Sequence, residues 1–188
     1  MVAEPTIPTN RNVGVLVSGR GSNFRSLLDA KARGDLDANF TVVISNNPSA
    51  GAKAHAEEFG IPWVVIDHRT FASRQAFEEE LVAQLRAHDV SVVVLAGFMR
   101  VLSSTFLDAY GGLTLNIHPS LLPAFPGLNA QKQAIEAGVR VSGCTVHLVD
   151  SGVDTGPIID QAVVAVPNDD TVEALSARIL VQEHRLLP

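Results

Sequence analysis

The sequence predicts an α/β fold in which helices flank a doubly wound, mostly parallel sheet. Short apolar runs rich in valine and isoleucine alternate along the chain with longer segments of helical periodicity. Several runs lack alternating polar residues, which is expected when helices cover both faces of a parallel sheet. Ligands of such folds bind beyond the carboxyl ends of the strands, so functional residues are expected just after the apolar runs.

Seven apolar runs are expected to form the strands. In chain order they are residues 13–17, 40–44, 63–66, 90–96, 113–117, 144–149 and 158–166. Their lengths are those of ordinary strands, and most are followed by glycine, asparagine, serine or proline.

The segments between the runs show helical periodicity. Two apolar helix faces are formed by Phe24 with Leu27 and Leu28, and by Phe77 with Leu81, Val82 and Leu85. Residues 50–59 are expected to form a helix that ends at Gly60, because glycine is favoured just past a helix. The last helix is expected to begin near Asp170, with Glu173 in a capping-box position, and to be still helical at Leu187.

Length and composition predict one domain, residues 12–188, after a flexible lead-in of residues 1–11 that lacks the apolar core of a signal peptide. The formal net charge of -6 disfavours nucleic acid as a partner. No stretch reaches the roughly 18 apolar residues of a membrane helix. We therefore expect a cytoplasmic protein that binds small molecules, without a membrane or nucleic-acid partner, as a monomer or homodimer.

The first apolar run is followed by the glycine-rich segment "SGRGSN". Its glycines allow a tight turn, and a helix beginning near Asn23 would direct free backbone N–H groups at an anion. A dinucleotide fingerprint needs a third glycine where the chain has Phe24, and an acidic residue after the second run, which is followed by serine and asparagine. A single phosphate held by Gly21, Ser22 and Asn23 is compatible with the segment, and so is a turn that binds nothing.

The fifth run leads into "NIHPSLLPAFPG". Strand alternation places Asn116 and His118 on the same side of the strand. An amide donor beside an imidazole suits the oxyanion that develops during acyl transfer. The prolines that follow restrict φ, so the loop is expected to be stiff, and its tight path allows a cis peptide bond at Leu122-Pro123.

Two further loops carry candidate groups. Asp154 lies in a glycine-rich turn between the last two runs, and a carboxylate near His118 would favour the imidazolium and could accept a proton from an amine. Residues 97–102 follow the fourth run and could line an apolar slot for a flat heterocycle. Taken alone, each loop is better explained structurally, by backbone hydrogen bonds to the aspartate and by core packing of Met99.

The remaining histidines are expected to be surface or structural residues. They are His55, His68, His88, His147 and His184. None has the spacing of a metal site, so no metal is expected. No G-x-S-x-G motif supports a nucleophilic serine, but direct attack by a substrate amine needs none.

Five motifs taken together resemble the folate-dependent formyltransferases, over about residues 13–188. They are "VLVSGRGSN", "VVVLAGFMRVLS", "NIHPSLLPAFPG", "HLVDSGVDTGPIIDQ" and "VQEHRLLP". The pair of "NIHPSLLP" and "DTGPI" is similar to the whole group, whereas "SGRGSN" and "PAFPGL" resemble its glycinamide ribonucleotide (GAR) branch. The resemblance implies a Rossmann-like formyltransferase fold, and it implies a further C-terminal segment that this chain lacks.

The resemblance also implies roles for particular residues. Asn116, His118 and Asp154 would form the catalytic set. Those expected to bind GAR are Gly21, Ser22, Asn23, Gln182 and Glu183. Those expected to bind folate are Arg74, Met99, Arg100, Val101, Leu102, Asn116, Asp150, Ser151, Gly152, Val153 and Asp154.

The implied reaction transfers the formyl group of 10-formyltetrahydrofolate, the co-substrate, to the amine of GAR in purine biosynthesis. Formyltetrahydrofolate hydrolase and the formyl-transfer domain of methionyl-tRNA formyltransferase are alternatives, but both carry an additional domain for which this chain has no room. A folate- or nucleotide-binding module without catalysis is a further alternative, although all three residues of the catalytic set are present.

Overall fold

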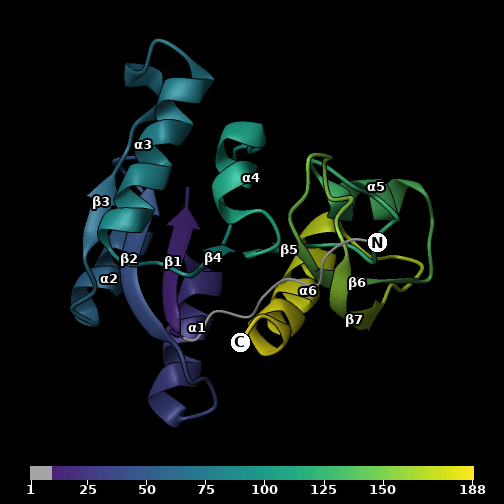
Figure 1. Cartoon of the computed structure of the whole chain (residues 1–188). Coiled ribbons are helices and arrows are strands. Elements are labelled where there is room, and N and C mark those ends of the chain that lie inside the picture. The colour runs from purple at the N-terminus through teal and green to yellow at the C-terminus, as the bar shows by residue number, and fades with distance from the viewer. Residues whose placement is uncertain (1–9) are drawn as a thin grey trace.

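A computed structural model describes residues 10–188 of the chain. Within them the chain forms one seven-stranded sheet of order β3-β2-β1-β4-β5-β6-β7 (Figure 1). The strands are β1 (Asn12–Val17), β2 (Asn39–Ser45), β3 (Trp63–Val65), β4 (Val92–Leu95), β5 (Thr114–His118), β6 (Val141–Leu148) and β7 (Ile158–Ala165). Each of the seven predicted runs overlaps one of these strands.

Six α-helices and one short 3-10 helix lie within the same residues. They are α1 (Ser22–Arg33), α2 (Ala52–Glu58), η1 (His68–Thr70), α3 (Arg74–Ala87), α4 (Ser104–Tyr110), α5 (Ala130–Glu136) and α6 (Val172–Leu186). Most of the predicted lead-in, residues 1–9, lies outside the described residues. Next to it, the Arg11 carbonyl accepts a hydrogen bond from the Asn39 N–H at 2.8 Å.

The sheet is parallel from β3 to β5 and antiparallel at β6 and β7. The predicted doubly wound, mostly parallel sheet is therefore confirmed. The strand order reverses between β1 and β4, and the carboxyl ends of the parallel strands meet at one edge there. The loops that follow β1, β4 and β5 are consequently neighbours, although they lie far apart in the sequence.

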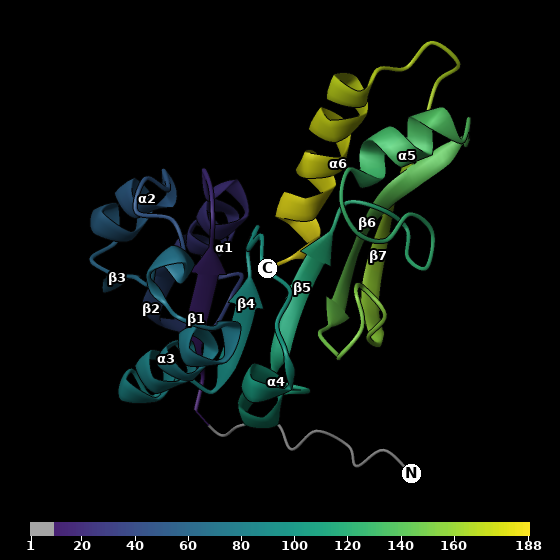
Figure 2. The ribbon, with the colours of Figure 1, turned by 90° about the horizontal axis from the view of Figure 1, so that it is seen from above.

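Two apolar layers hold the helices to the sheet. The first packs α1, α2, α5 and α6 on one face, through side chains such as Phe24 and Ile179. The second packs α3 and α4 on the other face, through Phe77, Leu81 and Phe106. Figure 2 shows this separation, with α3 and α4 on one side of the strands and the remaining helices on the opposite side. Burial on both faces explains why the strands lack polar alternation.

The helix ends follow the local sequence with corrections at both ends of α6, which ends at Leu186, one residue before the Leu187 that was expected to be helical. Gly60 has a φ of 64°, just after α2, as expected of a residue that ends a helix. The start of α6 was predicted one residue too early, because the Thr171 hydroxyl, and not Asp170, accepts the cap hydrogen bond from the Ala174 N–H at 3.1 Å. Asp170 instead forms an ion pair with Arg178.

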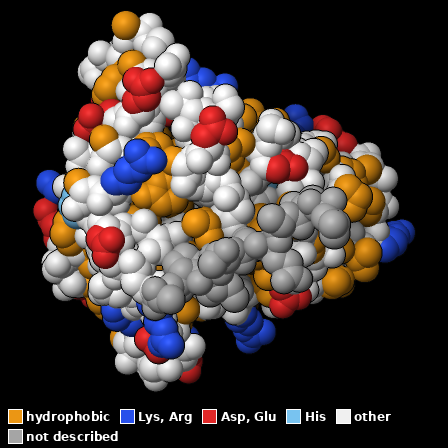
Figure 3. All heavy atoms as spheres, in the orientation of Figure 1, with side chains coloured by type: hydrophobic (Ala, Val, Ile, Leu, Met, Phe, Trp, Pro, Cys, Tyr) orange, Lys and Arg blue, Asp and Glu red, His pale blue; other side chains and the backbone are white. Residues whose placement is uncertain are grey.

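Charged side chains of both signs are interspersed on the face shown in Figure 3, and no continuous basic surface is visible there. This distribution agrees with the formal net charge of -6, and this face has no basic patch that would favour nucleic-acid binding. None of the helices in residues 10–188 is long and apolar enough to cross a membrane.

Candidate functional site

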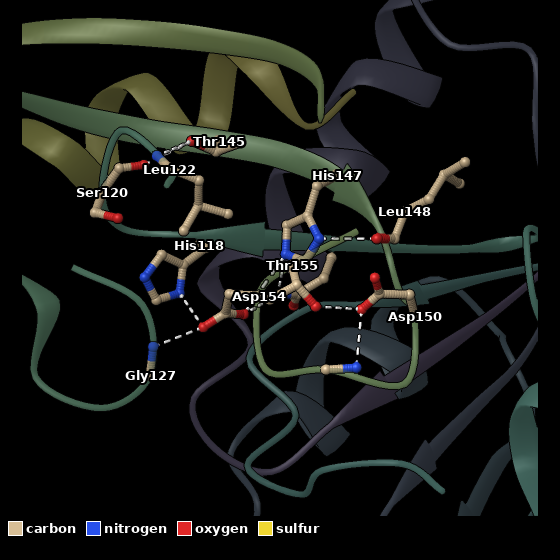
Figure 4. Close-up of polar contacts among 12 residues, drawn as sticks. His118, Ser120, Leu122, Gly127, Thr145, His147, Leu148, Asp150, Asp154 and Thr155 are labelled. Atoms are coloured by element: carbon tan, nitrogen blue, oxygen red, sulfur yellow. Dashed lines mark hydrogen bonds and ion pairs between the residues drawn. The ribbon is translucent and has the colours of Figure 1, made fainter. Parts of the chain in front are cut away.

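Asn116, His118 and Asp154 lie together at the carboxyl end of β5. His118 Nδ1 is 3.2 Å from Asp154 Oδ2, and Asn116 Nδ2 donates to Asp154 Oδ1 at 3.5 Å. Asn116 and His118 are two residues apart on β5, whereas Asp154 comes from the loop between β6 and β7. Figure 4 shows the Asp154 carboxylate between the His118 and His147 rings. The fold therefore unites the three residues that the sequence could only offer as separate candidates.

Both ring nitrogens of His118 face hydrogen-bond acceptors. Nε2 is 2.9 Å from the Phe125 carbonyl, which can only accept, so Nε2 carries a proton. Nδ1 faces the Asp154 carboxylate. The ring is 5% exposed. This geometry suits an imidazolium, since a doubly protonated ring donates to both acceptors.

The backbone that positions these two acceptors is unusual. Phe125 and Asp154 both have a φ of 55°, a conformation that residues other than glycine rarely adopt. The Gly127 N–H donates to Asp154 Oδ2 at 2.8 Å, which ties the two loops together. The fold thus stabilises an unfavourable backbone where it holds His118.

The environment of Asp154 favours its charged form. Burial alone would raise the pKa of this carboxyl, but contact with His147, the Gly127 N–H and the charge of His118 together lower it below its ordinary value. Asp154 is therefore a carboxylate at neutral pH and can act as a hydrogen-bond acceptor and a proton acceptor.

Hydrogen bonds from β6 and β7 hold the loop that follows His118. The Thr145 hydroxyl donates to the Ser120 carbonyl at 2.7 Å and accepts from the Leu122 N–H at 3.0 Å. Gln161 Nε2 donates to the Leu122 carbonyl at 2.9 Å. The Leu122-Pro123 bond is cis. The expected stiffness of this loop thus has a second source besides its prolines, namely hydrogen bonds from the buried Thr145 of β6 and the exposed Gln161 of β7.

His147 belongs to the same cluster, which the sequence did not predict. It is 2% exposed, and its Nδ1 donates to the Leu148 carbonyl at 2.9 Å. Nε2 lies 3.0 Å from Asn116 Nδ2 and 3.6 Å from Asp154 Oδ1. Antiparallel pairing of β5 with β6 places His147 opposite Asn116. No local sequence pattern predicts that pairing, so His147 was expected to be a surface or structural residue.

The predicted GAR-binding residues form a second cluster between α1 and α6. Gly21 has a φ of 78°, and a Cβ on it would lie 2.5 Å from the Ala52 Cβ, so glycine is required there. Asn23 Nδ2 donates to Glu183 Oε2 at 2.8 Å. Asn23 Oδ1 is buried and has no hydrogen-bond partner among the described residues. Gln182 is half-buried beside Glu183.

Glu183 is a buried carboxyl group with one neutral donor. Burial raises its pKa, and the hydrogen bond from Asn23 offsets only part of that effect. Because the helix begins at Ser22, its first backbone N–H groups point out of the amino end of α1. This cluster can therefore offer an anion the free N–H groups and can offer a sugar or amide the polar atoms of Asn23 and Glu183.

The predicted folate-binding residues after β4 form an exposed loop that is anchored by side chains. Met99 is 67% exposed and Val101 is 55% exposed. The Met99 N–H donates to the Ser18 hydroxyl at 2.8 Å. Arg74, expected to meet the acidic tail of folate, donates through Nη2 to the Val101 carbonyl. A hollow of about 450 Å³ beside this loop is lined by Ser18, Asn46, Asn47, His68, Arg69, Met99 and Arg100.

The turn between β6 and β7 is held by Asp150. Its Oδ1 accepts hydrogen bonds from the Gly152 N–H at 3.0 Å and from the Thr155 hydroxyl at 2.6 Å. Val153 is 49% exposed, directly before Asp154. The predicted folate residues 150–153 thus shape the turn that carries Asp154, and they leave an apolar side chain accessible.

The candidate residues accordingly form three clusters at the carboxyl edge of the sheet. Within residues 10–188 no side-chain hydrogen bond or ion pair joins the catalytic set to the cluster at α1 and α6 or to the loop after β4. In the same residues no group of three or more histidine, cysteine or acidic side chains has an arrangement that could hold a metal ion.

A family model described as formyl transferase matches residues 11–188. The chain belongs to this family. Among its members, the phosphoribosylglycinamide formyltransferase of Bacillus subtilis (strain 168) is 43% identical over 178 residues, which cover 95% of this chain and 91% of the relative.

Other relatives are longer or have known structures. The trifunctional purine biosynthetic protein adenosine-3 of Drosophila melanogaster is 50% identical over 181 residues, which cover 95% of this chain but 13% of that protein. The crystal structure of glycinamide ribonucleotide transformylase 1 from Symbiobacterium toebii superimposes with a TM-score of 0.93 at 47% identity, covering 95% of this chain and 84% of that one.

Proposed function

We propose that this formyl transferase moves the formyl group of 10-formyltetrahydrofolate to the amine of glycinamide ribonucleotide, the reaction of purine biosynthesis. The observation that carries the proposal is the contact of Asn116, His118 and Asp154, which come from two separate segments. Relatives named for this activity support the choice of substrates. The proposal includes a cytoplasmic location and a monomeric or homodimeric protein.

The proposed reaction begins with attack of the neutral GAR amine on the formyl carbon. A carbon–nitrogen bond forms, and the formyl oxygen becomes an oxyanion. The Asn116 amide and a protonated His118 stabilise this charge, because both are donors on the same side of β5. No protein nucleophile takes part.

Two protons must then move. The attacking amine loses a proton to Asp154, directly or through a water, and the folate N10 gains one as its bond to the formyl carbon breaks. His118 supplies the proton for N10. Its Nε2 proton is hydrogen-bonded to the Phe125 carbonyl, so delivering it means exchanging that bond for one to the substrate.

Substrate positioning falls to the other two clusters. Gly21, Ser22 and Asn23 would hold the GAR phosphate at the amino end of α1, with Gln182 and Glu183 near its ribose and glycinamide. The pterin would lie between residues 99–102 and the 150–154 turn, where Met99, Val101 and Val153 expose apolar surface. Arg74 would meet the glutamate tail with the part of its guanidinium that remains exposed.

The test is a formyl-transfer assay with GAR and 10-formyltetrahydrofolate. We expect formylated GAR and tetrahydrofolate in equal amounts, and no formate release when the amine is omitted. Inorganic phosphate should compete with GAR. Formate release without the amine would indicate the hydrolase instead, and binding of both substrates without turnover would indicate a module that only binds them. His118→Ala is the matched variant, expected to lose turnover while folate affinity is kept.

A further inference from the structure

We infer that Glu78 is a positioning residue for folate binding, which sets the conformation of the loop after β4 through Arg74 and Ser103. The inference rests on the proposed function, because it assigns that loop to the folate. Glu78 lies on α3, outside the catalytic set, and no motif of the sequence pointed to it.

Glu78 is an acidic side chain in an apolar layer. It is 1% exposed although its neighbours Phe77 and Leu81 belong to the core beneath α3. A carboxylate removed from water in this way is costly unless donors surround it. Arg74 Nε donates to Glu78 Oε1 at 2.9 Å, the Ser103 N–H donates to the same atom at 3.0 Å, and the Ser103 hydroxyl donates to Oε2.

These donors connect Glu78 to the end of the loop after β4, on both sides of Leu102. Ser103 directly precedes α4 and directly follows Leu102. Arg74 donates from one end of its guanidinium to Glu78 and through Nη2 to the Val101 carbonyl. The carboxylate therefore holds residue 103 directly and residue 101 through the arginine, and these positions enclose Leu102.

The start of the same loop is held separately, by Ser18, which directly follows β1. The Ser18 N–H donates to the Gly97 carbonyl at 3.1 Å, and the Ser18 hydroxyl accepts from the Met99 N–H. Between the two anchors, the backbone N–H groups of Val101 and Leu102 donate no hydrogen bond within residues 10–188. A loop held at both ends with free donors in the middle is preorganised to bind a polar, flat ligand.

The position of Arg74 explains why a buried carboxylate is used. Its side chain is 45% exposed. Nε and Nη2 donate within the protein, and Nη1 donates no hydrogen bond within residues 10–188. A long, flexible arginine side chain on a helix surface would lose rotamer entropy when it binds a ligand carboxylate. Glu78 restricts the side chain in advance, so that the loop backbone and the guanidinium are fixed together.

The decisive variant is Glu78→Gln, which keeps the size of the side chain and removes its charge. Kinetics of the full chain should show a KM for 10-formyltetrahydrofolate that rises about tenfold, as expected for loss of a charge-assisted hydrogen bond. The KM for GAR and kcat should change by less than about twofold. Glu79→Gln, an exposed neighbour on the same helix, is the matched control and should resemble the wild type.

Arg74→Lys provides the second measurement. It keeps a positive charge but lacks the planar fork that reaches Glu78 and Val101 at once. We expect a similar rise in the folate KM, and the double variant with Glu78→Gln should be little worse than either single variant, because the two residues act as a unit.

Several outcomes would overturn the inference. One is a folate KM for Glu78→Gln within twofold of the wild-type value. Another is an equal rise in both KM values together with a lower Tm, which would indicate a general structural role. If Glu78→Gln does not fold, Ser103→Ala, which retains the backbone N–H, must raise the folate KM alone. A wild-type protein that does not bind formyl-folate contradicts the proposed function, whereas wild-type binding with unchanged variants contradicts only the inference.

Discussion

His118 is held between two acceptors that the backbone presents in an uncommon conformation. The Phe125 carbonyl faces Nε2 and the Asp154 carboxylate faces Nδ1, and both residues have a positive φ. Such a conformation costs free energy that the surrounding hydrogen bonds must offset. The two acceptors would both be satisfied by a doubly protonated ring, which is the donor that the proposed reaction requires of His118.

The contribution of Asn116 can be measured by Asn116→Ala. Its amide is the neutral donor to the proposed oxyanion, and one such donor typically contributes about 2.7 to 4 kcal/mol to transition-state stabilisation. We expect kcat to fall by roughly 100-fold to 1,000-fold in the formyl-transfer assay, with little change in either KM. A fall of less than about threefold would remove Asn116 from the oxyanion site.

The ionisation of Asp154 should appear in the pH dependence of stability. Its folded pKa is lowered from the reference value of 3.8, so its charge stabilises the fold above that value, and the stabilisation is lost as the pH falls through the folded pKa. Asp154→Asn should therefore lower the free energy of unfolding at pH 7, and its difference from wild type should shrink below about pH 4. Denaturant unfolding across this range provides the measurement, and a difference independent of pH would contradict it.

At the scale of elements, the contact of α1 with α6 combines the proposed GAR site with polar groups that destabilise the fold. Asn23 and Glu183 provide polar atoms there. Asn23 Oδ1 is buried without a hydrogen-bond partner among the described residues, and the buried Glu183 accepts a hydrogen bond from Asn23. Buried polar groups without full hydrogen bonding destabilise a fold and commonly mark binding sites. This loss of stability is expected in the free protein, because a bound ribonucleotide would supply the missing hydrogen-bond partner.

Glu183→Gln should reveal this cost. The folded pKa of Glu183 is raised from the reference value of 4.5, so wild-type stability falls as the pH rises from that value through the folded pKa. The amide introduced by the substitution would carry no charge and could donate to the free Asn23 Oδ1. The difference in Tm between the variant and the wild type should increase in favour of the variant from pH 4 to pH 8. The GAR affinity of the variant should be lower than that of the wild type.

The exposed Glu173 on the same helix provides the control for that experiment. Glu173→Gln should show no such gain in Tm with rising pH, because this side chain is not buried. An identical pH trend in both variants would mean that the effect does not come from the burial of Glu183.

At the scale of the whole molecule, the winding of the sheet would separate the two proposed substrates and bring them together at the proposed catalytic set. Helices α1 and α6 lie in the apolar layer on one face, and α3 lies in the layer on the other (Figure 2). The catalytic residues come from β5 and the β6–β7 loop between these regions. Each substrate would thus have its own binding elements, and they would meet only where the formyl group is transferred.

Variants in the two outer clusters should consequently act independently. Asn23→Ala should raise the KM for GAR alone, and Arg74→Lys should raise the KM for formyl-folate alone. Since no side-chain hydrogen bond or ion pair joins their clusters within residues 10–188, the two effects should combine additively in the double variant, within about 0.5 kcal/mol. A larger coupling measured by steady-state kinetics would show that the substrate sites communicate.

Local patterns in the sequence were sufficient for the strands, their burial and the individual candidates. The apolar runs predicted every strand, because the central strands are buried on both faces and leave a continuous apolar signature, and the exposed edge strand β7 is apolar as well. Asn116 and His118 shared a strand face because side chains alternate. The glycine loop and the proline-rich loop could be recognised because special backbone conformations demand particular residues. These are effects that act between near neighbours along the chain.

The contacts between distant segments were decided only by the tertiary structure. Strand pairing brings His147 opposite Asn116, the β6–β7 turn brings Asp154 to His118, and α3 brings Glu78 beneath the loop after β4. None of these contacts has a local signature, because each depends on which strands pair and on which face each helix packs. The sequence by itself determined the chemical groups and their strand exits, and the tertiary structure determined which of those groups meet.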